Sequence, residues 1–174
     1  MMITEATSEH IPQLLDLVNI AYRSKTNQGW TSEADLVSGD RIHTYHLNEI
    51  LSDPSSKIFI IFQASQLVAC VHINISNQSC YIGMLTTHPD VQNQGIGKIM
   101  LDYAEKFALN HYAITSFTLS VLSARTELIN YYKRRGYEMT NIVDAYPHNA
   151  NVGIPKSDTL TVLHLIKHIH SQSA

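Results

Sequence analysis

The sequence has few cysteines, no long apolar run and no large excess of charge, and each absence excludes a class of protein. Its 174 residues include 2 cysteines, Cys70 and Cys80, too few for a disulfide framework or a four-ligand metal cluster. Both lie in apolar, strand-like surroundings, so we expect buried, reduced thiols. No apolar run approaches the roughly 20 residues that span a bilayer, and residues 1–5 lack the basic and apolar regions of a signal peptide. We therefore expect a cytoplasmic protein with no membrane partner.

The charge balance argues against nucleic acid as a partner. The formal net charge is −3, from 12 Lys and Arg against 15 Asp and Glu, which provides no basic field for a phosphate backbone. The length suits one domain over residues 1–174, since a chain of this size buries roughly 70% of its unfolded surface. We find no internal repeat or low-complexity tract.

Hydrophobic periodicity in the first half of the chain predicts a strand at 3–6 followed by a helix that Ser8 caps. Asn27-Gln28-Gly29 indicates a turn, residues 32–37 suit one or two helical turns, and residues 45–51 suit another helix. This irregular segment, between Arg23 and Ser56, is a candidate to form one wall of a substrate-binding site. Three β-rich runs follow at 57–62, 66–73 and 79–87, and their short polar links predict an antiparallel meander.

The second half continues with a helix from Ile96, whose apolar face includes Ile99. A strand at 116–121 and a helix that Thr126 caps and Gly136 ends come next. Strands are also predicted at 137–143 and 160–166. The last of these is apolar enough to be buried on both faces and could pair across a homodimer.

A glycine-containing turn, residues 92–98, separates the third β-rich run from the long helix. The first N–H groups of a helix have no intrahelical acceptor and lie at the positive end of the helix dipole. That arrangement binds phosphate, and Gly95 and Gly97 permit the close approach of a ligand to the backbone. The turn is therefore a predicted phosphate site.

Two known phosphate loops do not fit this turn. A Walker A loop needs Gly at position 92 and Ser or Thr at 99, where Gln92 and Ile99 stand. A dinucleotide fingerprint needs a small residue at 100, where Met100 stands, and an acidic residue about twenty positions later, where residues 115–121 offer none.

The pattern that remains, Gln92-x-x-Gly95-x-Gly97, resembles the pyrophosphate-binding motif of the GNAT superfamily of acyl-CoA-dependent N-acyltransferases. The β-rich run before it ends in Leu85-Thr86-Thr87-His88-Pro89, like the family's strand end. Residues 132–137 resemble the family's Tyr-x-x-x-Gly-aromatic ending. The resemblance covers residues 57–137. It implies an α/β fold with a mixed, mostly antiparallel sheet flanked by helices and splayed between the fourth and fifth strands, where the pantetheine arm of acetyl-CoA lies.

The resemblance also implies which residues bind acetyl-CoA. Main-chain groups at the strand end would pair with the pantetheine amides, and N–H groups of the glycine turn would bind the pyrophosphate. The residues assigned to this role are Leu85, Thr86, Thr87, Gln92, Asn93, Gln94, Gly95, Ile96, Gly97 and Lys98. Arg125 stands where the family often has Asn. Its guanidinium either reaches a cofactor carbonyl or phosphate, or belongs to a solvated residue at a helix start.

Tyr132 occupies the position of the family's general acid, so we expect it to protonate the departing thiolate of CoA. Tyr131 is its rival, because a shift of one residue turns a helix face by about 100 degrees. The general base stays open among Tyr81, His72 and water. Since neither cysteine lies near the expected thioester, the resemblance favours direct attack by the amine in a ternary complex.

The segment 29–35, with Asp40 and Arg41, sits where the resemblance places the family's acceptor site. Trp30 could offer a cation–π face and Glu33 or Asp35 a counter-charge to a cationic or amino-acid-like amine. Tyr81, on the fourth strand where some family members have Glu, is assigned to the same site. The alternative is a solvated loop anchored by one tryptophan.

Three histidines near the end of the chain, His164, His168 and His170, would share one side of a strand. No cysteine or carboxylate lies near them in sequence, so no metal is expected. The sequence thus predicts an acetyltransferase that uses acetyl-CoA to acetylate a primary amine of a small molecule or peptide. The alternative is a non-catalytic acyl-CoA-binding sensor or regulatory module.

Overall fold

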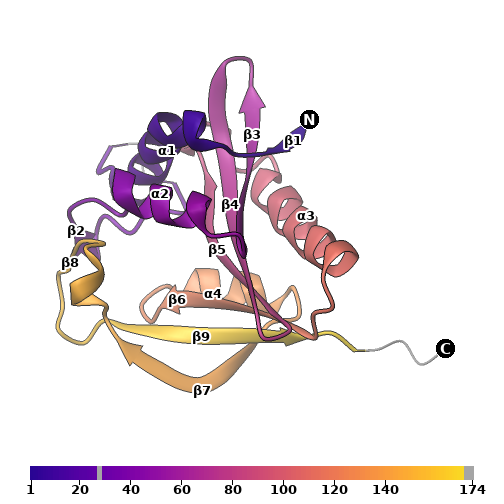
Figure 1. The fold of residues 1–174 in the computed structure, drawn as a ribbon. Coiled ribbons are helices and arrows are strands. Elements are labelled where there is room, and N and C mark those ends of the chain that lie inside the picture. Colours follow the sequence, from indigo (N-terminus) through magenta and orange to yellow (C-terminus); the bar gives the residue numbers. More distant parts are fainter. Residues whose placement is uncertain (27–28, 171–174) are drawn as a thin grey trace.

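The computed structural model describes residues 1–26 and 29–170; the turn predicted at Asn27 and Gln28 lies outside them. Within these residues, seven strands form one sheet in the order β1-β3-β4-β5-β6-β9-β7 (Figure 1). Neighbouring strands run antiparallel except β5 and β6, which are parallel. This confirms the predicted mixed, mostly antiparallel sheet. The strands are β1 (Ile3–Glu5), β3 (Ser56–Gln63), β4 (Gln66–Ser76), β5 (Ser79–Thr87), β6 (Ser116–Leu122), β7 (Glu138–Ala145) and β9 (Thr161–His168).

Helices cover both faces of the sheet. On one face, α1 (Ile11–Arg23) and α2 (Thr44–Ser52) pack on a core that contains Ile58 and Ile60 of β3. On the other, α3 (Ile96–His111) and α4 (Thr126–Lys133) pack on a core that contains Phe59 and Ile61. The period-two alternation of β3 therefore supplies both cores, as a strand covered on both faces requires.

Short elements connect these layers. Two strands, β2 (Val37–Ser38) and β8 (Ile154–Pro155), pair as a small separate ribbon. The 3-10 helices are η1 (Ser8–His10), η2 (Pro89–Val91) and η3 (His148–Ala150). Residues 32–37, predicted as one or two helical turns, contain a single turn, in which the N–H of Val37 donates to the carbonyl of Glu33 at 2.9 Å, and Val37 begins β2. No helix in the described part of the chain has both the length and the apolar character needed to cross a membrane.

Neither predicted helix cap occupies a cap position. Thr7 precedes the first 3-10 turn, and its N–H donates to His10 Nδ1 at 3.0 Å, so Ser8 lies inside the turn. Arg125, not Thr126, precedes α4. Gly136 follows that helix with φ +90°, a left-handed conformation that glycine adopts without strain, as predicted.

Two burial predictions also fail. Ile99 is 43% exposed on α3 and Leu101 is buried instead, because the buried face of the helix is rotated toward Leu101 relative to the predicted face. On β9, Leu165 alone is fully buried and most other positions are half-buried. β9 lies between β6 and β7, and most residues of β7 are exposed, so the apolar side chains of β9 are only partly buried.

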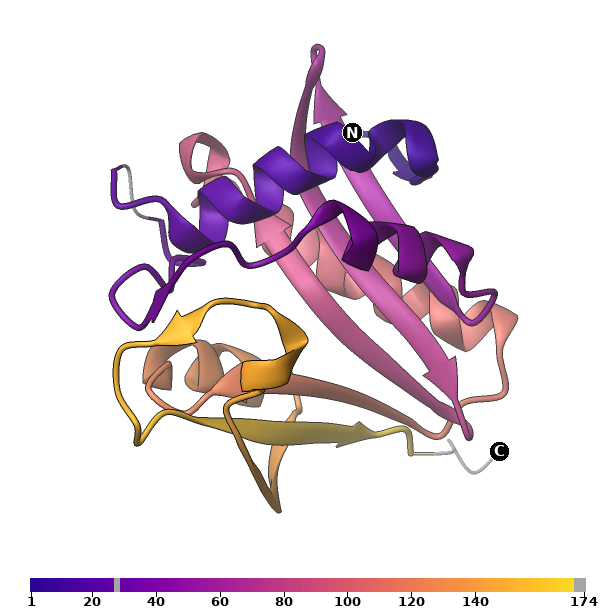
Figure 2. The same cartoon turned by 60° about the vertical axis from the view of Figure 1, so that its left-hand side comes forward.

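The sheet opens between β5 and β6, as predicted for the fourth and fifth strands. Their register holds for three residue pairs, from Ser79 opposite Ser116 to Tyr81 opposite Thr118. Beyond these pairs β5 continues to Thr87 and β6 to Leu122, and Figure 2 shows the two halves of the sheet diverging. The divergence leaves space beside the last residues of β5.

Candidate active site

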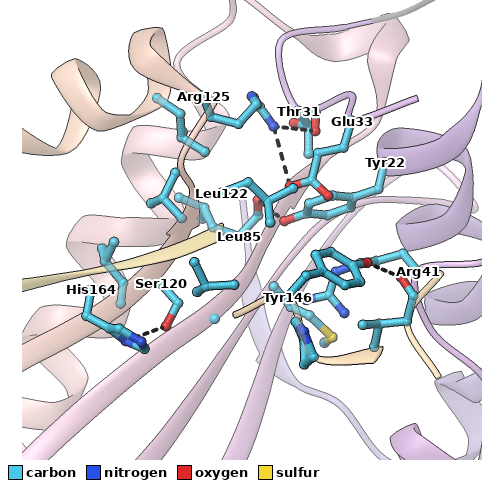
Figure 3. Close-up of a pocket in the computed structure, with 18 of the residues that line it drawn as sticks. Tyr22, Thr31, Glu33, Arg41, Leu85, Ser120, Leu122, Arg125, Tyr146 and His164 are labelled. Carbon is cyan, nitrogen blue, oxygen red and sulfur yellow. Dashed lines mark hydrogen bonds and ion pairs between the residues drawn. The ribbon is translucent and has the colours of Figure 1, made fainter. Parts of the chain in front are cut away.

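A cavity of about 390 Å³ lies where the two strands diverge. Its walls come from both strands, residues 81–85 of β5 and 119–122 of β6, and from α1, α4 and the segments around residues 30–41 and 144–152 (Figure 3). A pocket of this size and mixed lining suits a small-molecule site.

A β-bulge shapes the β5 wall of the cavity. Cys70 pairs with Thr86 and His72 with Gly83, so two residues of β5 oppose one of β4. Met84, inside the bulge, has φ +48°, and its carbonyl accepts a bond from Thr86 Oγ1 at 2.9 Å. A bulge re-aims the backbone that follows it. It therefore sets how Leu85, Thr86 and Thr87 present main-chain groups at the strand edge.

The N-terminus of α3 lies just after this strand and presents open backbone donors. Gly95 precedes the helix with φ +75°. Within residues 1–26 and 29–170, no protein acceptor bonds the N–H groups of residues 94–98. A Cβ built on Gly95 would meet nothing within 4 Å, and one on Gly97 would touch Thr87 Cγ2 at 3.8 Å. The predicted phosphate turn is thus open on its outer side, with Gln94 and Lys98 exposed.

The first residue of the motif, Gln92, uses its side chain inside the protein. Its Oε1 accepts the N–H of Trp30 at 2.7 Å, and its Nε2 donates to the carbonyl of Thr87 at 3.3 Å. A Cβ on Gly29 would come within 2.2 Å of the Gln92 amide, so the glycine allows this contact. Gln92 therefore ties the segment after α1 to the end of β5.

Arg125 also binds the segment after α1. Its exposure is only 4%, so it is not a solvated residue at a helix start. Its Nη1 donates to the carbonyl of Thr31 at 3.2 Å, its Nη2 to the carbonyl of Trp30, and its Nε to Glu127 Oε1 at 2.8 Å. All three nitrogens have protein partners. These contacts favour a role in holding the segment over a direct contact with a cofactor.

Three of the predicted acceptor residues, Trp30, Glu33 and Tyr81, line the cavity, but the carboxylate of Glu33 is already paired with arginines. Glu33 is buried, and its carboxylate lies 2.9 Å from Arg23 Nη1 and 3.6 Å from Arg125 Nη1. The Trp30 ring packs on Tyr131 with centroids 4.6 Å apart. Tyr81 lines the cavity, whereas Asp35 is exposed and lies outside it.

Tyr132, not Tyr131, faces the cavity. Tyr132 is 7% exposed and lines the cavity, and in the described part of the chain its hydroxyl has no hydrogen-bond partner. Burial raises its pKa far above the ordinary value, and the nearby Tyr22 and Tyr131 add to the shift, so the phenol stays protonated. Tyr131 lies between Trp30 and the guanidinium of Arg135, which is 3.4 Å from its ring centroid.

A hydrogen-bonded chain on the distal strands was missed by the sequence analysis. Ser120 and His164 are directly opposite each other on β6 and β9, with Ser120 Oγ 3.1 Å from His164 Nδ1. His164 Nε2 lies 2.6 Å from Asp144 Oδ2 of β7. All three residues line the cavity, and Figure 3 shows the bond between Ser120 and His164. The sign of this chain in the sequence was a polar residue within each of the three strands. The strand register, which the sequence pattern does not give, brings these three residues together.

His72, one candidate base, is poorly suited to that role. Burial lowers its pKa to about 4, and its Nε2 is 3.1 Å from Ser56 Oγ. A weakly basic imidazole takes up protons inefficiently at neutral pH.

Comparison with known families decides the identity of the fold. The profile of the acetyltransferase (GNAT) family matches residues 14–137, well over half of the chain. The chain belongs to the GNAT acetyltransferase family. The resemblance predicted from the glycine turn is confirmed, and the matched segment contains both that turn and Tyr132.

Solved GNAT structures share the fold at low sequence identity. The ribosomal-protein-alanine N-acetyltransferase from Brucella melitensis is 15% identical, with a TM-score of 0.71 over 97% of this chain and 100% of that one. A GNAT family acetyltransferase from Elizabethkingia anophelis, solved with acetyl-CoA bound, is 16% identical, with a TM-score of 0.70 over 97% of both chains. These likenesses show the GNAT fold.

A curated relative, acetyltransferase PseH from Campylobacter jejuni, is 24% identical over 96 residues. The alignment covers 55% of this chain and 59% of the relative, so the chain matches somewhat more than half of that protein's length.

Proposed function

We propose that this GNAT family member transfers an acetyl group from acetyl-CoA to a primary amine of a small molecule or peptide, by direct attack in a ternary complex. The observation that carries the proposal is the parting of β5 and β6 beside the open amides of residues 94–98. Family membership and the acetyl-CoA-bound neighbour support it. The acetyl donor supplies an activated thioester, so the protein has to bind, orient and move protons.

In this proposal the backbone binds the cofactor. Open N–H groups at the start of α3 bind the diphosphate, since they lie at the positive end of the helix dipole. The edge of β5 at Leu85, Thr86 and Thr87 pairs with the pantetheine amides as a neighbouring strand would, and an N–H beside the bulge stabilises the oxyanion. Gln92 and Arg125 act indirectly, because they hold Trp30 and Thr31, which line the cavity.

The proton donor in this proposal is Tyr132. Its hydroxyl faces the cavity, has no hydrogen-bond partner in the described part of the chain, and carries its proton at neutral pH. Neither cysteine suits an acyl-enzyme, because burial raises the pKa of Cys70 and of Cys80 to about 12. Direct attack by the amine is therefore the favoured route.

The test has two steps. Acetyl-CoA at about 100 times its dissociation constant should stabilise the protein by about 2.7 kcal/mol, which thermal unfolding detects. Release of free thiol is then measured with amino acids, polyamines, aminoglycosides and peptides as acceptors. Stabilisation without thiol release from any amine would favour the sensor alternative, and no stabilisation would contradict cofactor binding.

A further inference from the structure

In the described part of the chain, the arginines that line the cavity are paired with carboxylates, with one exception. Arg23 is neutralised by Glu33 at 2.9 Å, and its other nitrogens donate to the carbonyls of Gly39 and Val152. Arg125 is neutralised by Glu127 at 2.8 Å. These groups have little charge left to offer an acceptor.

Arg41 is the exception. It lines the main cavity and also a smaller adjoining hollow of about 140 Å³. Its guanidinium lies 5.5 Å from the centroid of the Tyr22 ring, and no carboxylate in residues 1–26 and 29–170 pairs with it. Its backbone is fixed, because its N–H donates to Asn19 Oδ1 at 2.8 Å. The acceptor end of the cavity therefore has one arginine that pairs with no carboxylate of the described residues, with its guanidinium near the Tyr22 ring.

We propose that the acceptor is an amine that also carries an anion, a carboxylate or a phosphate, and that Arg41 binds this anion. The proposal rests on the proposed acetyltransferase function. A guanidinium presents planar paired donors that match carboxylate and phosphate oxygens. The opposite reading, a polycationic amine held by Glu33, has less support because that carboxylate is already matched by two arginines.

Matched acceptor pairs test the proposal with the intact protein and acetyl-CoA. Each pair shares its amine and differs in the anion: an amino acid against its amide, and phosphoethanolamine against ethanolamine. We expect kcat/KM to be about 10- to 100-fold higher for the anionic member of at least one pair, and the pair showing it identifies the anion. Arg41→Gln should remove the preference by raising KM for the anionic acceptor, with little change for the neutral one. Arg134→Gln, at an exposed arginine outside the cavity, is the control and should keep the preference.

Equal turnover of both members, or preference for a polyamine, would overturn the Arg41 proposal while leaving acetyl transfer in place. Absence of thiol release with every amine would instead contradict the proposed function itself. The two failures are therefore distinguishable.

A separate observation, the chain from Ser120 through His164 to Asp144, carries a second proposal. The distances are 3.1 Å and 2.6 Å, and each residue comes from a different strand. If Asp144 accepts the Nε2 proton, Nδ1 of the neutral imidazole is free to accept the Ser120 hydroxyl. A base whose partner orients it in this way is ready to take up a proton.

We infer that this chain removes the proton of the attacking amine. The amine nitrogen bonds to the acyl carbon and the carbon–sulfur bond breaks. Before the attack, the ammonium form of the acceptor gives one proton to Ser120 Oγ as the hydroxyl proton passes to His164 Nδ1, which releases it to solvent. Tyr132 protonates the departing thiolate and is reprotonated by solvent, and the second nitrogen proton leaves to solvent as the amide forms. Ser120 contacts the reacting amine, while His164 and Asp144 are positioning residues that act through it.

The test compares Ser120→Ala and His164→Gln with the wild-type protein on its best acceptor. At neutral pH, kcat/KM should fall about 10- to 100-fold, and the deficit should shrink as pH rises toward the pKa of the amine, which then loses its proton unaided. Thr118→Ala, on the same strand but outside the cavity, should behave like wild type. The other ionisable groups lining the cavity are unchanged in every variant; they are Tyr22, Arg23, Glu33, Arg41, Tyr81, Arg125, Tyr132 and Tyr146. A deficit constant with pH, or an acylated Ser120 found by mass spectrometry, would overturn the relay.

Discussion

The two halves of the cavity are built from different parts of the chain. On the proposed cofactor side the binding groups are main-chain: the edge of β5 and the open amides at the start of α3. On the proposed acceptor side they are side chains from α1, β6, β7 and β9, with most of their charges paired. The first half depends on backbone shape and the second on which side chains the strand register brings together. Substitutions should therefore act differently in the two halves.

The largest effect is expected where the two halves meet, at Tyr132. Tyr132→Phe removes the proton donor, so kcat should fall about 10²- to 10⁴-fold while the affinity for acetyl-CoA stays unchanged. Since the raised pKa of Tyr132 favours the protonated phenol, the wild-type enzyme should lose no activity through this group below about pH 10. Thiol release and calorimetry with acetyl-CoA measure the two quantities. Equal activity of the variant would exclude Tyr132 as the acid.

The second largest effect is expected at Arg125, which holds Trp30 and Thr31 beside the cavity. Arg125→Met leaves the carbonyls of Trp30 and Thr31 without their donor and removes one of the two cations near Glu33. We expect a loss of about 3 kcal/mol in the free energy of unfolding. Arg134→Met, at an exposed position, should cost almost nothing. Denaturant titration of both variants gives the comparison, and equal stabilities would show that the buried contacts contribute little.

A smaller effect is expected at Gly97, on the proposed cofactor side of the cavity, where the binding groups are main-chain. Gly97 has an ordinary helical conformation with room for a Cβ, so Gly97→Val should fold while placing a side chain beside the open amides. We expect acetyl-CoA to bind about tenfold more weakly, equivalent to about 1.4 kcal/mol. Lys106→Val supplies the same residue type at an exposed site in α3 as a control. Gly95 is a poorer probe, because its φ of +75° strains any β-branched residue.

The smallest effect is expected at the thiols. Cys70→Ala and Cys80→Ala should each keep kcat within about twofold of wild type, since burial raises both thiol pKa values and direct transfer needs no thiolate. A large loss of kcat in a variant with near-native thermal stability would point to a covalent intermediate.

The same contrast explains how much the sequence could predict. The glycine turn, the β5 end and Tyr132 lie within local patterns, so residues 57–137 were enough to identify the family and the splayed sheet. The partners of Arg125 and Glu33 are distant in sequence and depend on the path of the chain between α1 and α2. The pairing of Ser120 with His164 depends on a register between strands 44 residues apart. A one-residue shift would have put His164 on the other face.

The central claim is that the diphosphate of acetyl-CoA binds the amides that open α3 while the pantetheine arm lies along β5. The most direct measurement is a titration of ¹⁵N-labelled protein with acetyl-CoA, followed by amide chemical shifts. The account predicts that the largest shifts occur at residues 94–98 and at Leu85, Thr86 and Thr87. Saturable binding that leaves both groups of amides unmoved would contradict it.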